Sequence, residues 1–139
     1  MIRTATRADV DAVQGLIRQL SRHDFTEEQF EACYLHNLEN NHILVYEKNK
    51  RVVGCGVLAI QYPLHFSQRS SELVNLIVDE NARGGGIGKK LLAALEQIAV
   101  SHKCVCVEAD SGKQREDAHR FYNREGFVCN HYKFTKGLI

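Results

Sequence analysis

Four glycines clustered past the middle of the chain are the strongest chemical signal in the sequence. Residues 83–90 read RGGGIGKK, between a predicted strand and a predicted helix. Glycine lets the backbone turn tightly and brings its N–H groups close to a ligand without a shielding side chain. The first turn of a helix carries unpaired N–H groups and partial positive charge. Together these features predict a phosphate or pyrophosphate site.

Three nucleotide-binding motifs compete for this segment, and their spacing separates them. A Walker A loop needs a glycine where Arg83 stands, and a serine or threonine where Lys90 stands. The dinucleotide fingerprint G-x-G-x-x-G lacks its third glycine from either starting point. The pattern that fits is Arg-x-x-Gly-x-Gly, at Arg83, Gly86 and Gly88. A glycine loop that only begins a helix stays open as the alternative at this point.

The surrounding elements must position this loop. Thr6 with Asp9, and Thr26 with Gln29, have the spacing of capping boxes that begin helices. A third helix follows the glycines to His102, and a fourth is ended by a glycine, as helix C-caps favour. The buried stripe of the second helix is expected to be Phe30, Cys33, Tyr34 and Leu38. Alternation predicts strands at residues 2–6, 43–47, 52–60, 72–78, 104–109, 127–129 and 131–135. The expected fold class is therefore α/β (α+β), a mixed sheet of about seven strands flanked by four helices on both faces.

Composition narrows the class of protein. A chain of 139 residues fits one domain, expected to span residues 1–139, and its net charge of +1 gives no reason to expect nucleic acid as a partner. No apolar run approaches a membrane span, and the first residues lack the apolar core of a signal peptide. The five cysteines form no CxxC and the seven histidines no HxH or HxxxH pair, so no metal is expected. These observations predict a cytoplasmic protein with reduced, half-buried thiols and no membrane partner.

The spacing of the arginine and glycines resembles the acetyl-CoA pyrophosphate loop of the GCN5-related N-acetyltransferases (GNAT). Upstream, residues 72–80 look like the fourth strand of that family and its exit. Downstream, residues 118–127 look like its Ala-x-x-Phe-Tyr-x-x-x-Gly-Phe element. Arg115 stands where many members carry an asparagine that contacts the cofactor, which leaves one family contact unassigned. The resemblance implies an acetyltransferase with acetyl-CoA as co-substrate.

The resemblance also implies where acetyl-CoA lies. In this family the sheet splays between its fourth and fifth strands, and the pantetheine arm occupies the gap. Its amides are expected to pair with the fourth strand at Leu76 and Val78, while the N–H of Leu76 or Ile77 faces the thioester oxygen. The expected cofactor-binding residues are Leu76, Ile77, Val78, Arg83, Gly84, Gly85, Gly86, Ile87, Gly88 and Lys89.

Acetyl transfer requires a neutral amine and a proton for the departing thiolate. An alkylammonium with a pKa near 10 is roughly 0.1% deprotonated at pH 7, a cost of about 4 kcal/mol that a base relieves. The resemblance implies Glu72 as this base, directly or through water, and Tyr122 as the proton donor to the thiolate. The structural alternatives are a solvated Glu72 at a strand end, and a Tyr122 that only packs beside Phe121 and Phe127.

Within the family, residues 117–126 and 131–136 look similar to aminoalkylphosphonate N-acetyltransferases. This resemblance implies that the acceptor is a small amine with an anionic phosphonate. Binding of that phosphonate requires a fixed cation or hydrogen-bond donors in the protein. The candidates border the expected acceptor site: Arg22, His23, His65, Arg69 and Lys133. A homodimer is expected by analogy with relatives. A polyamine or a peptide N-terminus stays open as acceptor. A non-catalytic acyl-CoA-binding module is the alternative to an enzyme, although the intact Tyr122 favours the enzyme.

Overall fold

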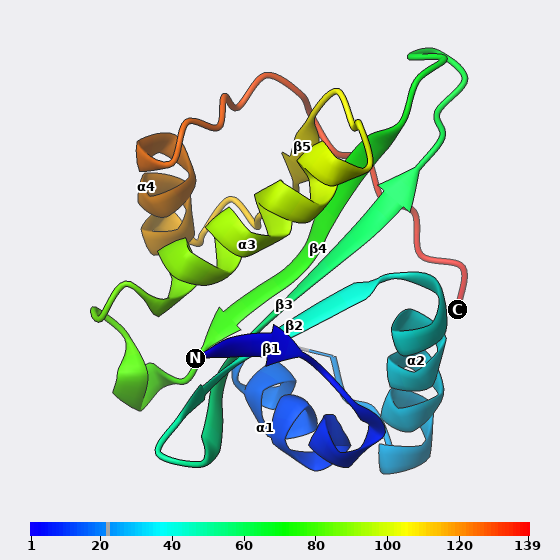
Figure 1. Cartoon of the computed structure of the whole chain (residues 1–139). Helices are drawn as coiled ribbons and strands as arrows, with labels where there is room; N and C mark the ends of the chain where they lie inside the picture. The colour runs from blue at the N-terminus through cyan, green and yellow to red at the C-terminus, as the bar shows by residue number, and fades with distance from the viewer. Residues whose placement is uncertain (22) are drawn as a thin grey trace. The chain divides into compact units, whose positions relative to one another are not determined.

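Five strands form one sheet whose neighbours follow the order of the sequence (Figure 1). The computed structural model describes residues 1–21 and 23–139, so the predicted site residue Arg22 lies outside the described residues. β1 to β4 are joined by antiparallel pairs. The bounds are β1 Ile2–Thr4, β2 His42–Lys48, β3 Arg51–Gln61, β4 Ser70–Val78 and β5 Val107–Ala109.

The chain divides into two units, Met1–Glu108 and Ala109–Ile139. The first unit holds α1 (Val10–Leu20), α2 (Glu27–Asn40) and α3 (Ile87–Ser101). The second unit holds α4 (Glu116–Arg124). None of the helices in the described ranges combines the length and the apolar character that crossing a bilayer requires.

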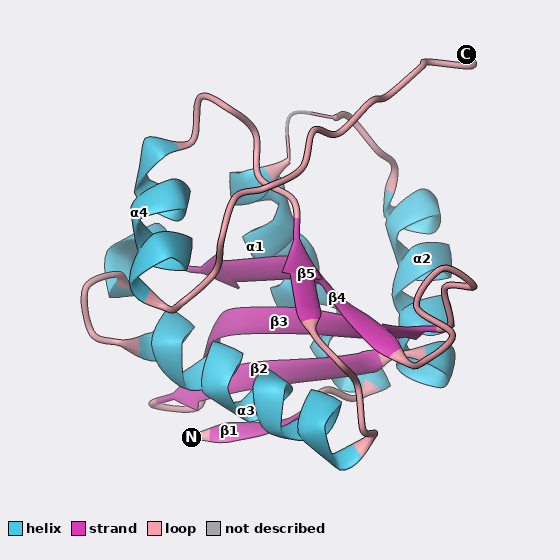
Figure 2. Cartoon of the chain, turned by 90° about the horizontal axis from the view of Figure 1, so that it is seen from above, coloured by secondary structure: helices cyan, strands magenta, loops and turns pink. Residues whose placement is uncertain are grey.

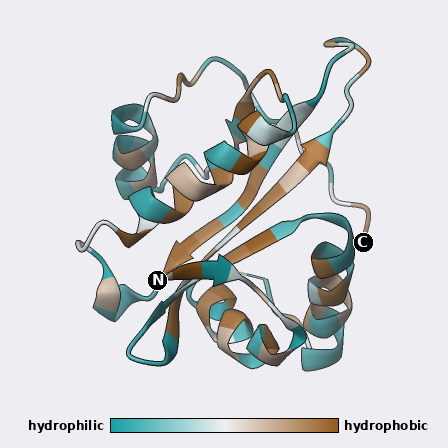
Figure 3. Cartoon of the chain, in the orientation of Figure 1, coloured by the Kyte–Doolittle hydropathy of each residue, from teal (hydrophilic) through white to brown (hydrophobic). Residues whose placement is uncertain are grey.

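In the first unit, helices cover both faces of the sheet (Figures 1 and 2). Because successive strand residues point to opposite faces, Val45, Cys55 and Val57 turn toward α1 and α2 and join one buried cluster with Val13 and Leu16. The residues between them along β2 and β3, such as Leu44, Gly54 and Gly56, turn toward α3. Figure 3 shows apolar residues along the strands and along the sides of the helices that meet them. The core of this unit is therefore two apolar layers with the sheet between them.

α3 lies close to the sheet because β3 carries glycines beneath it. A Cβ at Gly56 would come within 2.6 Å of Leu95 Cδ1, and a Cβ at Gly54 within 3.0 Å of Leu91 Cδ1. Leu91 and Leu95 are fully buried. The glycines thus set how closely the helix that follows the 83–90 loop packs on the sheet.

β4 contains a bulge that changes which face its residues point to. Val57 pairs with Asn75 and the next residue, Leu58, pairs with Leu73, so Val74 is an extra residue in β4. Asn75 shares the α1/α2 face with Val57. Glu72 pairs with Ala59, which is on that same face of β3. Uninterrupted alternation would have turned Glu72 toward α3 instead.

Most of the predicted helices and their ends are confirmed. Both capping boxes are present, at Thr6 with Asp9 and at Thr26 with Gln29, although the first opens a 3-10 turn before α1. Gly126, with φ of 94°, follows the end of α4 as predicted.

Other sequence predictions were wrong in their details. The sheet has five strands among the described residues, not seven, because residues 127–129 and 131–135 adopt no regular secondary structure. An alternating pattern forms a strand only where a neighbouring strand supplies its hydrogen bonds. The strand predicted at residues 104–109 is shorter, since Cys104 N–H donates to Ala99 O at the end of α3. Cys33 and Cys129 are exposed rather than half-buried, so Cys33 leaves the predicted stripe of α2.

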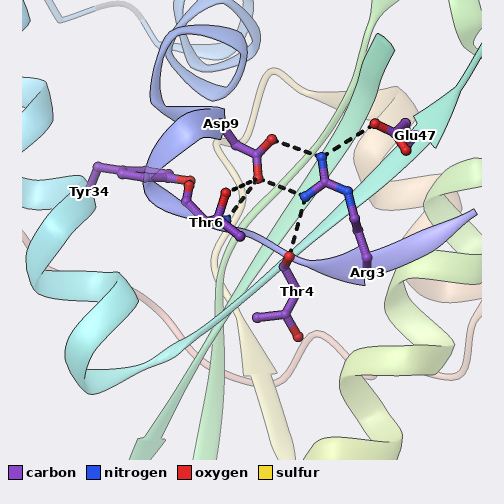
Figure 4. Close-up of polar contacts among 6 residues, drawn as sticks. All are labelled: Arg3, Thr4, Thr6, Asp9, Tyr34 and Glu47. Atoms are coloured by element: carbon purple, nitrogen blue, oxygen red, sulfur yellow. Dashed lines mark hydrogen bonds and ion pairs between the residues drawn. The ribbon is translucent and has the colours of Figure 1, made fainter. Parts of the chain in front are cut away.

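A partly buried ion pair ties β1 to the start of α1 (Figure 4). Arg3 donates to both carboxylate oxygens of Asp9, at 2.8 and 2.9 Å, and Asp9 is 7% exposed. Thr6 N–H donates to Asp9 Oδ2 at 2.8 Å, and the Tyr34 hydroxyl donates to Thr6 O at 2.6 Å. The pKa of Asp9 is lowered mainly by the hydrogen bond from Arg3, against the opposing effect of burial. The sequence analysis identified the capping box but missed Arg3.

Arg3→Met should lower the free energy of unfolding by about 2–3 kcal/mol, because it leaves the Asp9 carboxylate buried without its cation. Arg7→Met is the matched control, since Arg7 is exposed on the next turn, and we expect a change within about 0.5 kcal/mol. Chemical denaturation at pH 7 measures both. Equal losses in the two variants would contradict the assignment.

The pH dependence of stability gives this prediction a second readout. The folded-state pKa of Asp9 lies below its ordinary value of 3.8, so its contribution is present above pH 3.8. It is lost as the pH falls through the folded-state pKa. The Arg3→Met variant should therefore lose less stability than the wild type between neutral pH and that acidic range. If the free energy of unfolding fell equally with pH in the wild type and in Arg3→Met, the ion pair between Arg3 and Asp9 would contribute nothing to stability.

Candidate functional site

The glycine loop has the geometry of an anion cradle at the start of a long helix. Gly84 and Gly86 have φ of 87° and 78°, in the left-handed region that favours glycine, and Gly86 is the N-cap of α3. A Cβ at either glycine would meet no protein atom within 4 Å. The space in front of these two residues is therefore open to a ligand, and a side chain there would enter it.

The N–H groups of this loop are available to a ligand. Asp79 begins the preceding turn, where Ala82 N–H donates to Asp79 O at 2.8 Å. Lys90 is the first residue of the helix start whose N–H is paired, with Gly86 O at 3.0 Å. Between them, the N–H groups of residues 83–89 have no acceptor within the part of the chain that the structure describes. Such a row of N–H groups on exposed glycines fits a pyrophosphate.

Arg83 also closes the loop onto the strand before it. Its Nε donates to Val78 O at 3.1 Å, at the last residue of β4. Leu76, Ile77 and Val78 precede the loop on β4, and Ile77 is buried against α1 and α2. The backbone bonds from β4 toward the β5 segment lie earlier, where Val105 N–H donates to Arg69 O and Ser71 N–H to Cys106 O.

Glu72 is half-buried on the α1/α2 face of the sheet, where the bulge directs it. Its Oε2 accepts a hydrogen bond from Gln61 Nε2 at 3.1 Å. The other carboxylate oxygen, Oε1, has no hydrogen-bond donor among residues 1–21 and 23–139.

Tyr122 belongs to the second unit, where aromatic rings hold it in place. It makes edge contacts with Phe121 and Phe127, with ring centroids 5.5 and 5.2 Å apart. Burial raises the pKa of Tyr122, with the positive charge of Arg115 acting in the opposite direction. The phenol is therefore protonated at neutral pH and can act as a proton donor. The same ring contacts are expected if Tyr122 only packs beside Phe121 and Phe127, so its role as a proton donor stays a prediction.

The predicted acceptor-binding cations lie in different places. Arg69 donates to His102 O at 3.1 Å and lies beside the Tyr62 ring, where the β3–β4 connection surrounds a hollow of about 340 Å³. His65, in the same connection, is exposed and packs on Phe66. Lys133 belongs to the second unit and pairs with Asp110 at 3.3 Å.

Sequence reasoning missed a second cavity, of about 270 Å³, beneath α1 and α2. Asn75 lines it from β4, together with Val57 from β3. One signal was available in the sequence, since Asn75 is a polar residue inside the otherwise apolar run of residues 73–78. An amide in such a run indicates that one position of the strand faces something other than core.

Comparison with known proteins identifies the family. The model of the acetyltransferase (GNAT) family matches residues 11–127. The chain is 36% identical over 139 residues to the aminoalkylphosphonate N-acetyltransferase of Salmonella typhimurium, covering 99% of this chain and 90% of that one. It is 29% identical over 123 residues to the IAA acetyltransferase of Azospirillum brasilense, covering 85% and 78%.

A solved structure supports the fold. An aminoglycoside N-acetyltransferase in complex with CoA matches with a TM-score of 0.89 over 100% of this chain and 95% of that chain, at 16% identity. Identity this low shows a shared fold alone. The family and the enzyme class are instead shown by the family match over residues 11–127 and by the relative that is similar over nearly the full length. The chain belongs to the acetyltransferase (GNAT) family, the GCN5-related N-acetyltransferases, and is an N-acetyltransferase that uses acetyl-CoA.

Proposed function

We propose that the enzyme transfers the acetyl group of acetyl-CoA directly to the primary amine of a small aminoalkylphosphonate. The observation that carries the cofactor part is the row of unpaired N–H groups at residues 83–89, on a loop whose glycines leave open space. The acceptor part is supported by the relative of that name, which is similar over nearly the whole chain.

The cofactor contacts in this proposal come from three adjacent parts of the chain. The backbone of Gly84 to Gly88 binds the pyrophosphate, and Lys89 lies at the start of α3 near the outer phosphates. Leu76 and Val78 offer their backbone groups to the pantetheine amides, in the gap that the family opens between β4 and β5. The N–H of Leu76 or Ile77 stabilises the charge that develops on the thioester oxygen.

Two side chains move protons in this proposal. Glu72 takes a proton from the ammonium group, directly or through a water, so that the amine nitrogen can form its bond to the acetyl carbon. As the carbon–sulfur bond breaks, Tyr122 donates its phenolic proton to the sulfur. In this direct transfer the nitrogen, cationic once bonded to the acetyl carbon, loses its second proton to water. Water then returns a proton to the Tyr122 phenolate and takes the proton held by Glu72, so that one proton is released overall.

The phosphonate needs cations outside the buried core. Arg69 and His65 are exposed on the connection that leads into β4, not far along the chain from Glu72. Lys133 and Arg22 complete the proposed set. A homodimer stays a prediction by analogy with relatives, and a cytoplasmic location stays a prediction from the composition of the sequence.

An acceptor screen tests the proposal. The purified chain is incubated with acetyl-CoA and aminomethylphosphonate, 2-aminoethylphosphonate, a polyamine or an N-terminal peptide, and thiol release is followed with time. We expect the phosphonates to give the highest kcat/KM. Preferred turnover of a polyamine or peptide would reject the phosphonate. Acetyl-CoA binding without turnover of any amine would instead favour a binding module.

A further inference from the structure

The proposed chemistry makes no use of the cavity beneath α1 and α2. It lies within the first unit, bounded by α1, α2 and strands β2, β3 and β4. Its lining includes the apolar side chains of Val13 from α1, Ile43 from β2 and Val57 from β3, which are all buried. Its volume of about 270 Å³ exceeds the roughly 150 Å³ that suffices for an apolar cavity to bind benzene.

One wall of the cavity is a row of three stacked aromatic rings. The centroids of Phe25 and Phe30 are 5.7 Å apart, those of Phe30 and Tyr34 are 5.9 Å apart, and both pairs are within 27° of parallel. Arg18 holds the outer ring, with its guanidinium 4.2 Å from the Phe25 centroid and a hydrogen bond to Phe25 O. This aromatic wall, formed by Phe25, Phe30 and Tyr34, presents flat apolar surface to an occupant.

The polar groups of the cavity are few and mostly occupied. Gln29 accepts from Thr26 N–H in the capping box, and the Asn37 amide is bonded within α2 and to Asn41. The side-chain amide of Asn75 is half-buried and has no hydrogen-bond partner among residues 1–21 and 23–139. The described lining residues carry no charge. A dianionic group would therefore be costly inside this cavity, whereas an apolar group would not.

The bulge in β4 connects this cavity to the proposed base. Because Val74 is an extra residue, Glu72 and Asn75 occupy successive positions on the α1/α2 face. An amine held at Glu72 thus lies on the same face of the sheet as Asn75, one same-face position away, so a substituent of the acceptor can extend toward the cavity.

We infer that the acceptor is a primary amine whose carbon skeleton carries an aryl or branched alkyl substituent, and that this substituent binds in the cavity lined by Asn75, Val57 and the aromatic wall. This inference rests on the proposed function, because it takes Glu72 as the group that receives the amine. It makes Val57 and the aromatic wall determinants of acceptor specificity, while the phosphonate stays outside the cavity.

A matched acceptor pair tests this inference in the full chain. Aminomethylphosphonate and 1-amino-2-phenylethylphosphonate share the amine and the phosphonate and differ in the apolar substituent. We expect kcat/KM to be at least about 10-fold higher for the phenyl compound, as pocket contacts of this kind provide. Equal or lower kcat/KM for the phenyl compound, with aminomethylphosphonate still acetylated, would overturn the inference and leave the proposed function in place.

Filling the cavity should remove this preference. Val57→Phe places a ring on the floor, and Val100→Phe makes the same change on exposed surface of α3 as the control. The ratio of the two kcat/KM values should fall toward unity in Val57→Phe and stay at the wild-type value in Val100→Phe. If Val57→Phe does not fold, Ile17→Phe fills the half-buried side of the cavity. An unchanged ratio in a folded cavity-filling variant contradicts the inference.

A binding measurement separates the cavity from the reaction. If no amine is acetylated, the proposed function fails, but 2-phenylethylamine can still be titrated into the protein. Shifts of the Asn75 side-chain amide resonances that are lost in Val57→Phe would support the cavity as a binding site. Absence of those shifts at millimolar amine would reject it.

Discussion

Tyr122→Phe should lower kcat by about 10²–10⁴-fold, the range that loss of a general acid typically produces. The substitution removes the phenolic proton and keeps the ring, so the edge contacts with Phe121 and Phe127 remain. The dissociation constant for CoA should therefore change by less than about twofold. Steady-state kinetics at saturating substrates and calorimetric titration with CoA measure the two quantities.

Tyr132→Phe is the matched control, because Tyr132 is 84% exposed, and its kcat should equal that of the wild type. The pH profile adds a readout that a packing role would not move. Burial raises the pKa of Tyr122 above 10.0, so wild-type kcat should fall only when the pH rises beyond that value. Tyr122→Phe should lack this alkaline decrease. Unchanged kcat in Tyr122→Phe would remove the residue from the mechanism.

Gly86→Val should weaken CoA binding by at least about 10-fold, or about 1.4 kcal/mol. The valine side chain would project into the open space before the N–H groups of residues 83–89, where the pyrophosphate is expected to bind. Calorimetric titration with CoA measures the loss. Retained affinity would show that the pyrophosphate lies elsewhere.

Backbone strain must be separated from this steric effect, since Gly86 has φ of 78°. Gly126→Val is a matched control, because Gly126 has φ of 94° and its Cβ would also meet nothing within 4 Å. Both variants should lose thermal stability through strain of about 1–2 kcal/mol. Only Gly86→Val should lose CoA affinity. Equal losses of affinity would attribute the effect to unfolding rather than to the loop.

Local signals were sufficient for much of the fold. The capping boxes at Thr6 and Thr26 and the apolar stripe of α3 depend on residues a few positions apart, so they could be read from the sequence. The glycine loop was equally local, since a φ of 78° at Gly86 favours glycine itself. Motif spacing alone therefore predicts the glycine loop that begins α3.

Interactions between distant segments could not be read in this way. The hydrogen bond from the Tyr34 hydroxyl to Thr6 O joins positions 28 residues apart, and the cavity beneath α1 and α2 depends on the packing of two helices on three strands. The alternating pattern at residues 131–135 predicted a strand, but pattern alone does not supply a hydrogen-bonding neighbour. Such features require the tertiary structure.

The extra residue Val74 shifts the alternation of side chains along β4. Before it, the even-numbered residue Glu72 faces α1 and α2; after it, the odd-numbered residues Asn75 and Ile77 do. Removing that one residue would leave the order of Leu76, Ile77 and Val78 before the loop unchanged. The residues Leu73 and Asn75 would then be neighbours in regular alternation, so Leu73 would still face α3 and Glu72 would still face α1 and α2. A single-codon deletion of Val74 could thus remove the bulge while keeping the proposed proton acceptor on its present side of the sheet.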